Sequence, residues 1–178
     1  MLDVLQIRRL EVSDAPVYRA FRLRVLHEYA EAFTSSFEEE SIKLLLDTEK
    51  RLRAVETSKL WGVFASGQLA GMVGLNLEMS LKNRHKGLLV SMYVAPEYAG
   101  RGLGCLLVDA VLHDAVACGL ESILLTVTDS NQAAIALYQK CGFTAFGTEP
   151  DAIRVNGASF GKIHMYRSLK KTHKNNGI

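Results

Sequence analysis

The chain has 178 residues, the size of one domain, and its 48% hydrophobic and 22% charged residues are the composition of an ordinary globular protein. The 21 Lys and Arg against 19 Asp and Glu leave a formal net charge of +2, which argues against nucleic acid as the main partner. No apolar run reaches the roughly 20 residues of a membrane span, and residues 1–9 lack the pattern of a signal peptide. We therefore expect a cytoplasmic protein that binds neither nucleic acid nor membrane.

The three cysteines, Cys105, Cys118 and Cys141, are odd in number and do not have the spacing of a zinc site. Each lies among apolar residues, which favours a small buried side chain over a disulfide framework or a metal ligand. Residues 1–169 contain no linker or repeat and are predicted to form a single domain. The basic residues 170–178 are predicted to form a disordered tail.

The first third of the chain predicts a strand followed by two helices. Residues 5–10 have the pattern of a strand. Ser13, Asp14 and Pro16 indicate the start of a helix that continues to about residue 29. Its predicted inner face consists of Val17, Ala20, Phe21 and Val25. After a break at residues 34–36, the acidic residues 38–40 suit the N-terminus of a second helix. The apolar side chains predicted for that helix are Ile42, Leu45, Leu46, Leu52 and Val55.

The rest of the chain alternates strands and helices. Residues 60–65 and 69–77 are predicted to form an antiparallel hairpin around a short turn, followed by a polar loop and a buried strand at 88–94. Apolar residues at helical spacing predict a helix over 102–117, which Gly119 ends. A strand at 122–127, a helix at 131–141 and strands at 143–147 and 160–169 follow. This order predicts a mixed α/β fold.

The most informative segment is residues 94–104, which leaves a buried strand, turns through Gly100, Gly102 and Gly104, and enters a helix. Glycines let a backbone approach a ligand closely, and the free N–H groups of a helix N-terminus attract anions. Arg101 adds a nearby cation. A dinucleotide-binding fingerprint would need a third glycine where Cys105 stands, although Glu121 lies near its expected acidic position. A P-loop would need Gly-Lys-Ser/Thr, which is absent.

Residues 99–104 (Ala-Gly-Arg-Gly-Leu-Gly) resemble the Q/R-x-x-G-x-G/A motif with which GNAT acetyltransferases bind acetyl-CoA. Residues 131–143, from Asn131 to Phe143, are similar to the later N-x-x-A-x-x-L-Y-x-x-x-G-F motif of the same family. The two motifs occur in the family's order with one strand between them. The resemblance implies a central twisted mixed sheet of about seven strands over residues 5–169. About four helices would flank it, and a splayed strand pair would hold acetyl-CoA.

The resemblance also implies an activity and its residues. The protein would transfer an acetyl group directly from acetyl-CoA to a primary amine, with Tyr138 as the general acid and no metal. The cofactor-binding residues it implies are Met92, Tyr93 and Val94 for the pantetheine arm, Gly100, Arg101, Gly102, Leu103, Gly104 and Cys105 for the pyrophosphate, and Asn131. The backbone near Val94 would stabilise the developing oxyanion. A homodimer is allowed, because members of the family often dimerise.

The sequence departs from the family's pattern at two positions. Ala99 stands where the family usually has Gln or Arg, which weakens the match only slightly. Thr126 stands where several relatives carry a Glu, so no general base is assigned. Asp129, Glu78 and His85 are the nearby alternatives, and each also suits a turn or an exposed loop.

Three functions therefore remain open. The first is an N-acetyltransferase, the second a non-catalytic acetyl-CoA-binding module, and the third a dinucleotide-binding oxidoreductase, which Cys105 disfavours. The acceptor pocket of an acetyltransferase would lie between the connection of the first two helices and the last two strands. The residues expected to line it are Tyr29, Phe33, Thr34 and residues 151–159.

Overall fold

The computed structural model describes residues 4–170. Most of the predicted tail, residues 171–178, lies outside the described residues. Its first residue, Lys170, is described, and its ammonium pairs with the carboxylate of Glu121 at 2.7 Å.

Seven strands and five α-helices form the described part of the chain. In chain order they are β1 (Leu5–Arg9), α1 (Ala15–Glu28), α2 (Phe37–Ser41), α3 (Leu45–Arg53), β2 (Ser58–Ala65), β3 (Gln68–Leu77), β4 (Lys86–Val94), α4 (Leu103–Ala117), β5 (Ser122–Thr128), α5 (Gln132–Lys140), β6 (Thr144–Val155) and β7 (Ala158–Ser168). Three short 3₁₀ turns, η1 (Val12–Asp14), η2 (Ala30–Ala32) and η3 (Pro96–Tyr98), lie between them. The predicted mixed α/β class is confirmed.

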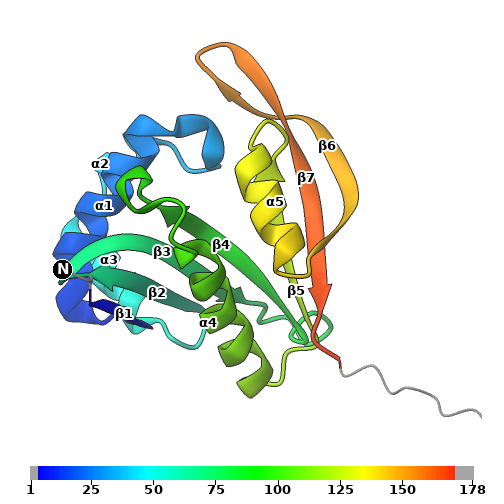
Figure 1. The fold of residues 1–178 in the computed structure, drawn as a ribbon, viewed down its shortest axis with the longest axis horizontal. Helices are drawn as coiled ribbons and strands as arrows, with labels where there is room; N and C mark the ends of the chain where they lie inside the picture. Colours follow the sequence, from blue (N-terminus) through cyan, green and yellow to red (C-terminus); the bar gives the residue numbers. More distant parts are fainter. Residues whose placement is uncertain (1–3, 171–178) are drawn as a thin grey trace, which may run out of the picture.

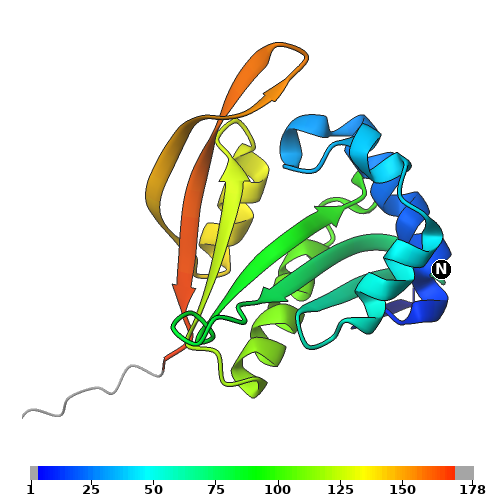
Figure 2. The same cartoon turned by 180° about the vertical axis from the view of Figure 1, so that it is seen from behind.

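All seven strands belong to one sheet in the order β1-β2-β3-β4-β5-β7-β6. Every neighbouring pair is antiparallel except β4 and β5, which run parallel and pair only from Lys86 to Leu88 on β4. Beyond Leu88 the two strands diverge, and the sheet opens into two halves (Figures 1 and 2). This is the splayed strand pair that the resemblance implies.

Helices cover both faces of the larger half of the sheet. On one face α4 packs over β2, β3 and β4, and its buried residues Leu107 and Val111 meet Val63 and Val73. On the other face α1 and α3 contribute Tyr18, Val25 and Leu52 to a second core. Helix α5 lies beside the diverging strand β5 (Figure 1). Helix α4 therefore covers the sheet on the β4 side of the opening, and α5 covers it on the β5 side.

Two predictions about the N-terminal helices are wrong in detail. Val17, 42% exposed, and Ala20 face solvent, because the buried stripe of α1 is made by other residues: Ala15, Tyr18, Phe21, Arg22, Val25 and Leu26. The predicted second helix is two short helices. The backbone becomes extended at Leu44, whose N–H donates to the Asp47 carboxylate at 3.0 Å, so a new helix begins there. Ile42 is consequently 81% exposed.

The last two strands are longer than predicted. They form one hairpin, in which β6 and β7 turn at Asn156 and Gly157, both with positive φ (50° and 82°). Such a pair suits the type I′ turn of a two-residue hairpin. The segment 151–159, predicted as a loop, is therefore mostly strand. It carries a register shift between Glu149 and Ile153, at which Asp151 has a φ of 50°.

Candidate functional site

The predicted glycine turn joins β4 to α4. Gly100 and Gly102 both have a φ of 75°, a backbone conformation that L side chains rarely adopt, and a Cβ at either position would meet open space. Gly102 is the N-cap of α4 and no side chain caps the helix. The first N–H groups of α4 are therefore left for a ligand, which is the geometry of an anion-binding helix N-terminus.

The remaining residues of the turn act through their backbone or through packing. Leu103 is fully buried in the core, so only its N–H could meet a ligand. Gly104 serves helix packing, because a Cβ there would lie 2.9 Å from a methyl of Leu137 on α5. The Cys105 Sγ lies 3.8 Å from the Sγ of buried Cys141. The Arg101 guanidinium lies 5.3 Å from the ring centroid of Tyr98.

A bulge in β4 determines which face of the sheet each of the following side chains occupies. Residues 91 and 92 together oppose Val73 of β3, and Ser91 has a positive φ of 56°. Met92 packs with α4, whereas Tyr93 points to the other face. There its ring contacts Phe21, Tyr29 and Phe33, with centroids 5.4 to 6.4 Å apart.

A cleft of about 370 Å³ opens where β4 and β5 diverge; we call it the interstrand cleft. Most of the predicted site residues outside the glycine turn line it. Its walls are Tyr29, Ala32, Phe33, residues 89–94, Pro96, Ala99, Thr126, Val127, Asn131, Ala134 and Tyr138. Beyond Leu88 the edge of β4 that faces this cleft has no partner strand among the described residues. Its backbone N–H and C=O groups are thus free to bind an extended ligand.

Tyr138 and Asn131 reach the cleft from α5. Tyr138 is only 5% exposed, its ring packs edge-on against Phe143, and its hydroxyl has no hydrogen-bond partner within residues 4–170. Burial, with a smaller contribution from Cys141, raises the pKa of Tyr138 above its ordinary value, so the phenol stays protonated. The Asn131 Oδ1 accepts from the Ala134 N–H at 3.1 Å and caps α5. Asn131 therefore has a structural role whether or not it also meets a ligand.

A second cavity of about 250 Å³ adjoins the cleft; we call it the arginine cavity. It shares Ala32, Phe33, Leu89, Val90, Ser91 and Thr126 with the cleft, and its charged lining is Arg22, Arg51, Lys162 and Glu40. Burial lowers the pKa of Arg22 and of Lys162. The sequence analysis assigned none of these four residues to the site; Glu40 appeared there only as part of the acidic start of a helix. Arg22 lies in the observed buried stripe of α1, which differs from the predicted one.

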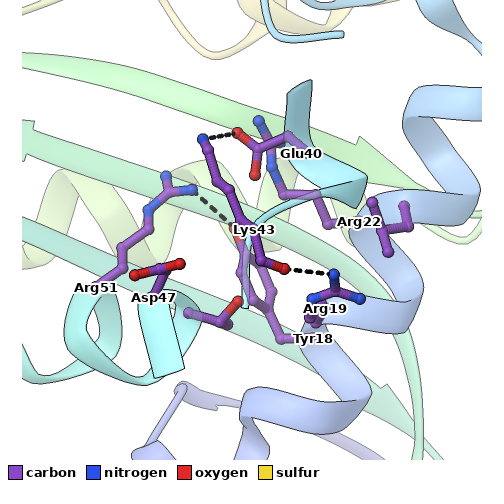
Figure 3. A pocket seen from close by; sticks show the side chains of 9 residues that line it. Tyr18, Arg19, Arg22, Glu40, Lys43, Asp47 and Arg51 are labelled. Carbon is purple, nitrogen blue, oxygen red and sulfur yellow. Dashed lines mark hydrogen bonds and ion pairs between the residues drawn. The ribbon is translucent and has the colours of Figure 1, made fainter. Parts of the chain in front are cut away.

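Arg22 and Arg51 also line a third cavity, between α1 and α3 (Figure 3). In this view Arg51 donates to the Tyr18 hydroxyl at 3.2 Å, and Lys43 pairs with Glu40 at 2.5 Å. Arg19 donates to the backbone carbonyl of Lys43 at 2.7 Å. These hydrogen bonds hold α3 and the loop between α2 and α3 against α1. They therefore fix the positions of Arg22 on α1 and Arg51 on α3 relative to each other.

The predicted acceptor region does contain a cavity. A fourth one, of about 490 Å³, lies between the α1–α2 connection and the β6–β7 hairpin, and Phe33, Thr34 and residues 153–156 line part of it. The Lys162 ammonium donates to the Thr34 hydroxyl and so links β7 to that connection. The buried Thr128 hydroxyl donates to the Glu31 carbonyl at 2.7 Å and links β5 to η2.

None of the alternative bases lines these four cavities. Glu78 and His85 are exposed at the end of the sheet where β4 and β5 pair, away from the opening. The Asp129 carboxylate packs against Gly161. Thr126 lies where the cleft and the arginine cavity meet. Among residues 4–170 we find neither a cluster of three His, Cys, Asp or Glu able to hold a metal ion nor a helix long and apolar enough to cross a membrane.

Comparison with known proteins agrees with this geometry. The chain is 29% identical over 122 residues to the L-methionine sulfoximine/L-methionine sulfone acetyltransferase of Salmonella typhimurium, covering 66% of this chain and 69% of that protein. A mycothiol acetyltransferase of Mycobacteroides abscessus is 39% identical over 69 residues, and the match spans only 21% of its length and 39% of this chain. The structure of a GNAT-family acetyltransferase from Streptococcus pneumoniae superposes with a TM-score of 0.85 at 29% identity, over 94% of this chain and all of that one. The model of the acetyltransferase (GNAT) family matches residues 22–143, and the chain belongs to that family.

Proposed function

We propose that the protein is an N-acetyltransferase that transfers the acetyl group of acetyl-CoA directly to a primary amine. The observation that carries this proposal is the divergence of β4 and β5 beside the uncapped N-terminus of α4. The family membership and the name of the Salmonella relative support an amine acceptor. One domain over residues 1–169 and a cytoplasmic location belong to the same proposal. The three free thiols suit a reducing compartment.

The residues present fit acetyl-CoA. The N–H groups at the start of α4 and the two left-handed glycines would hold its pyrophosphate, and the free edge of β4 would bind its pantetheine arm. Asn131 would orient that arm with its amide nitrogen, since its oxygen is already used in the cap. When bound, acetyl-CoA supplies the acetyl thioester.

Two groups of this chain would assist the transfer. The backbone near Val94 would donate to the thioester carbonyl oxygen as negative charge develops there. The Tyr138 hydroxyl would donate a hydrogen bond to the departing sulfur. Because burial raises the pKa of Tyr138, we assign it the role of a neutral donor that stabilises the thiolate, since transferring its proton to the thiolate is unfavourable.

The acceptor amine would reach the cleft already deprotonated. Among the residues that line the cleft there is no Asp, Glu or His to remove its proton. The terminal α-amine of a peptide has a pKa of about 8, so roughly half of it is neutral at pH 8, whereas a lysine-type amine with a pKa of about 10.4 is almost fully charged. The absence of a base from the cleft lining therefore favours acceptors with amines of low pKa.

The direct test measures free thiol released from acetyl-CoA with a panel of amino acids, polyamines, aminoglycosides and peptides, beside calorimetric binding of acetyl-CoA. Turnover with any class establishes the enzyme. Binding without turnover for every class would favour the second candidate, a non-catalytic acetyl-CoA-binding module. Thr126 in place of the relatives' Glu is the observation that favours that candidate. The homodimer stays a prediction that light scattering would test.

A further inference from the structure

Arg22 is a buried guanidinium without an ion pair. Arg22 is 6% exposed, and its guanidinium donates to two neutral hydroxyls, Ser35 Oγ at 3.1 Å and Ser91 Oγ at 3.4 Å. The guanidinium also lies 5.8 Å from the ring centroid of Phe33. Its Nε has no partner among residues 4–170. Arginine is almost never buried unless it is paired, because desolvation of the charge is costly. No carboxylate among the described residues contacts the Arg22 guanidinium directly, and Glu40 acts on its charge only through space.

A second guanidinium converges on the same oxygen. Arg51 donates to Ser91 Oγ at 3.4 Å, and its other amino group donates to the Tyr18 hydroxyl at 3.2 Å. Arg22 and Arg51 repel each other, and a neutral hydroxyl does not compensate two positive charges. Two guanidinium groups that converge on one point could each donate to one carboxylate placed there, through charge-assisted hydrogen bonds.

The other charges of the arginine cavity do not neutralise the pair. Lys162 adds a third cation, and Glu40 is the one carboxylate among the cavity's lining residues. The Glu40 Oε1 lies 2.5 Å from the ammonium of Lys43, so this acid is already paired. Three cations against one carboxylate, which is already paired with Lys43, leave the cavity electropositive.

The position of the cavity assigns its ligand to the acceptor. Ser91 and Thr126 line both the arginine cavity and the interstrand cleft, so an anion on the arginines would lie next to the place of acetyl transfer. The glycine turn that suits the cofactor's pyrophosphate leads into α4, which packs on the opposite face of the sheet from α1 and α3. The phosphates of the cofactor therefore have a separate site.

We propose that Arg22 and Arg51 bind a carboxylate of the acceptor, and that the acceptor is an α-amino acid. This inference rests on the proposed function. In an α-amino acid the amine and the carboxylate share one carbon, so the carboxylate can meet the arginines while the amine enters the adjoining cleft.

The first experiment compares matched acceptors in the thiol-release assay. The probes are L-amino acids with uncharged side chains, each paired with its carboxamide and its decarboxylated amine, together with dipeptides of the same residues. Loss of the α-carboxylate should lower kcat/KM by about 10- to 100-fold, as expected for losing one charge-assisted pair. The dipeptides distinguish a free amino acid from the C-terminal carboxylate of a peptide.

The second experiment changes the arginines. Arg51 is the better target because it is only half-buried, whereas replacing the buried Arg22 could also disturb folding. Arg51→Gln should remove the preference for the amino acid over its carboxamide, while the KM for acetyl-CoA stays unchanged. Arg53→Gln is the matched control: the same charge change on the same helix, at an exposed residue paired with Glu49.

The outcomes separate this inference from the proposed function. If carboxamides or polyamines are acetylated as well as amino acids, the inference is overturned and the acetyltransferase stands. If no amine is acetylated, the same amino acids are titrated calorimetrically into the CoA-saturated protein. Binding that Arg51→Gln abolishes and Arg53→Gln retains supports the carboxylate site without turnover. Undetectable binding by wild type, or equal binding by wild type and Arg51→Gln, overturns it.

Discussion

The Gly102→Ala substitution tests whether the turn before α4 holds the pyrophosphate. A Cβ at Gly102 meets no protein atom within 4 Å, so the structural cost comes only from placing alanine at a φ of 75°. The left-handed conformation costs an L residue roughly 1–2 kcal/mol, partly offset by the about 0.4–1 kcal/mol that alanine gains through a less flexible unfolded chain. We expect a net loss of about 1 kcal/mol, or a Tm lower by about 2–4 °C in a chain of this size.

Binding of acetyl-CoA should suffer more than stability. The new methyl group occupies space beside the free N–H groups of α4, where the pyrophosphate would sit. Losing one charge-assisted hydrogen bond there costs about 1.5–3 kcal/mol, which corresponds to a Kd that is about 10- to 150-fold higher. Calorimetric titration of acetyl-CoA measures this Kd, and thermal denaturation measures the Tm.

Gly119→Ala is the matched control at the other end of the same helix. Gly119 also has a φ of 75° and open space around its Cβ, so its alanine variant carries the same strain. It should lose the same stability and bind acetyl-CoA like the wild type. Equal Kd values for Gly102→Ala and Gly119→Ala would refute the assignment of the pyrophosphate to this turn.

Three further results follow from the packing and the charges. Gly71→Ala should lower the Tm by about 2–12 °C. Its Cβ would lie 2.9 Å from the Tyr93 carbonyl oxygen, and overpacking of this kind costs about 1–3 kcal/mol; an unchanged Tm would show that β4 shifts freely. Tyr138→Phe should lower kcat more than it raises the KM for acetyl-CoA, with little change in Tm because the hydroxyl lacks a protein partner among the described residues; a change in KM alone would limit the hydroxyl to binding. Burial raises the pKa of Tyr93, as it does that of Tyr138, above the value of about 10 in the unfolded chain. The stability that these two phenols contribute is therefore present below pH 10 and is lost above it, by up to about 1.4 kcal/mol per pH unit for each phenol. Tyr93→Phe should reduce that slope in denaturant titrations, and an undiminished slope would contradict the assignment.

The parts of the site that depend on local backbone chemistry could be predicted from the sequence. The glycine turn is one of them, because left-handed residues at the start of a helix require glycine and because free N–H groups occur there in any helix. Asn131 as an N-cap is another, since its side chain needs only the next turn of its own helix. The turn at Asn156 and Gly157 is an equally local signal, and weighing it would have extended the predicted hairpin.

The parts that depend on long-range packing could not be predicted. The bulge at Ser91 exists because two residues of β4 face one residue of β3, and nothing near Ser91 in the sequence indicates that mismatch. The break at Leu44 separates two helices within an apolar run that reads as one. Arg22 looks like an ordinary helix residue until α3 and β4 bring Arg51 and Ser91 beside it.

Strand β4 would keep the proposed cofactor site and the proposed acceptor site adjacent but separate. Side chains alternate along a strand, so Met92 and Val94 face α4, whereas Ser91 and Tyr93 face α1 and α3. The bulge at residues 91 and 92 determines which side chains face which side of the sheet. It lies just beyond Leu88, where β5 diverges from β4. Under the two proposals, the free edge of β4 would bind the acetyl donor, and the face of β4 that carries Ser91 would bind the acceptor. A one-residue shift at the bulge would exchange the faces and move the Ser91 hydroxyl away from both arginines. The register of β4 would thus determine the relative position of the proposed cofactor site and the proposed acceptor site.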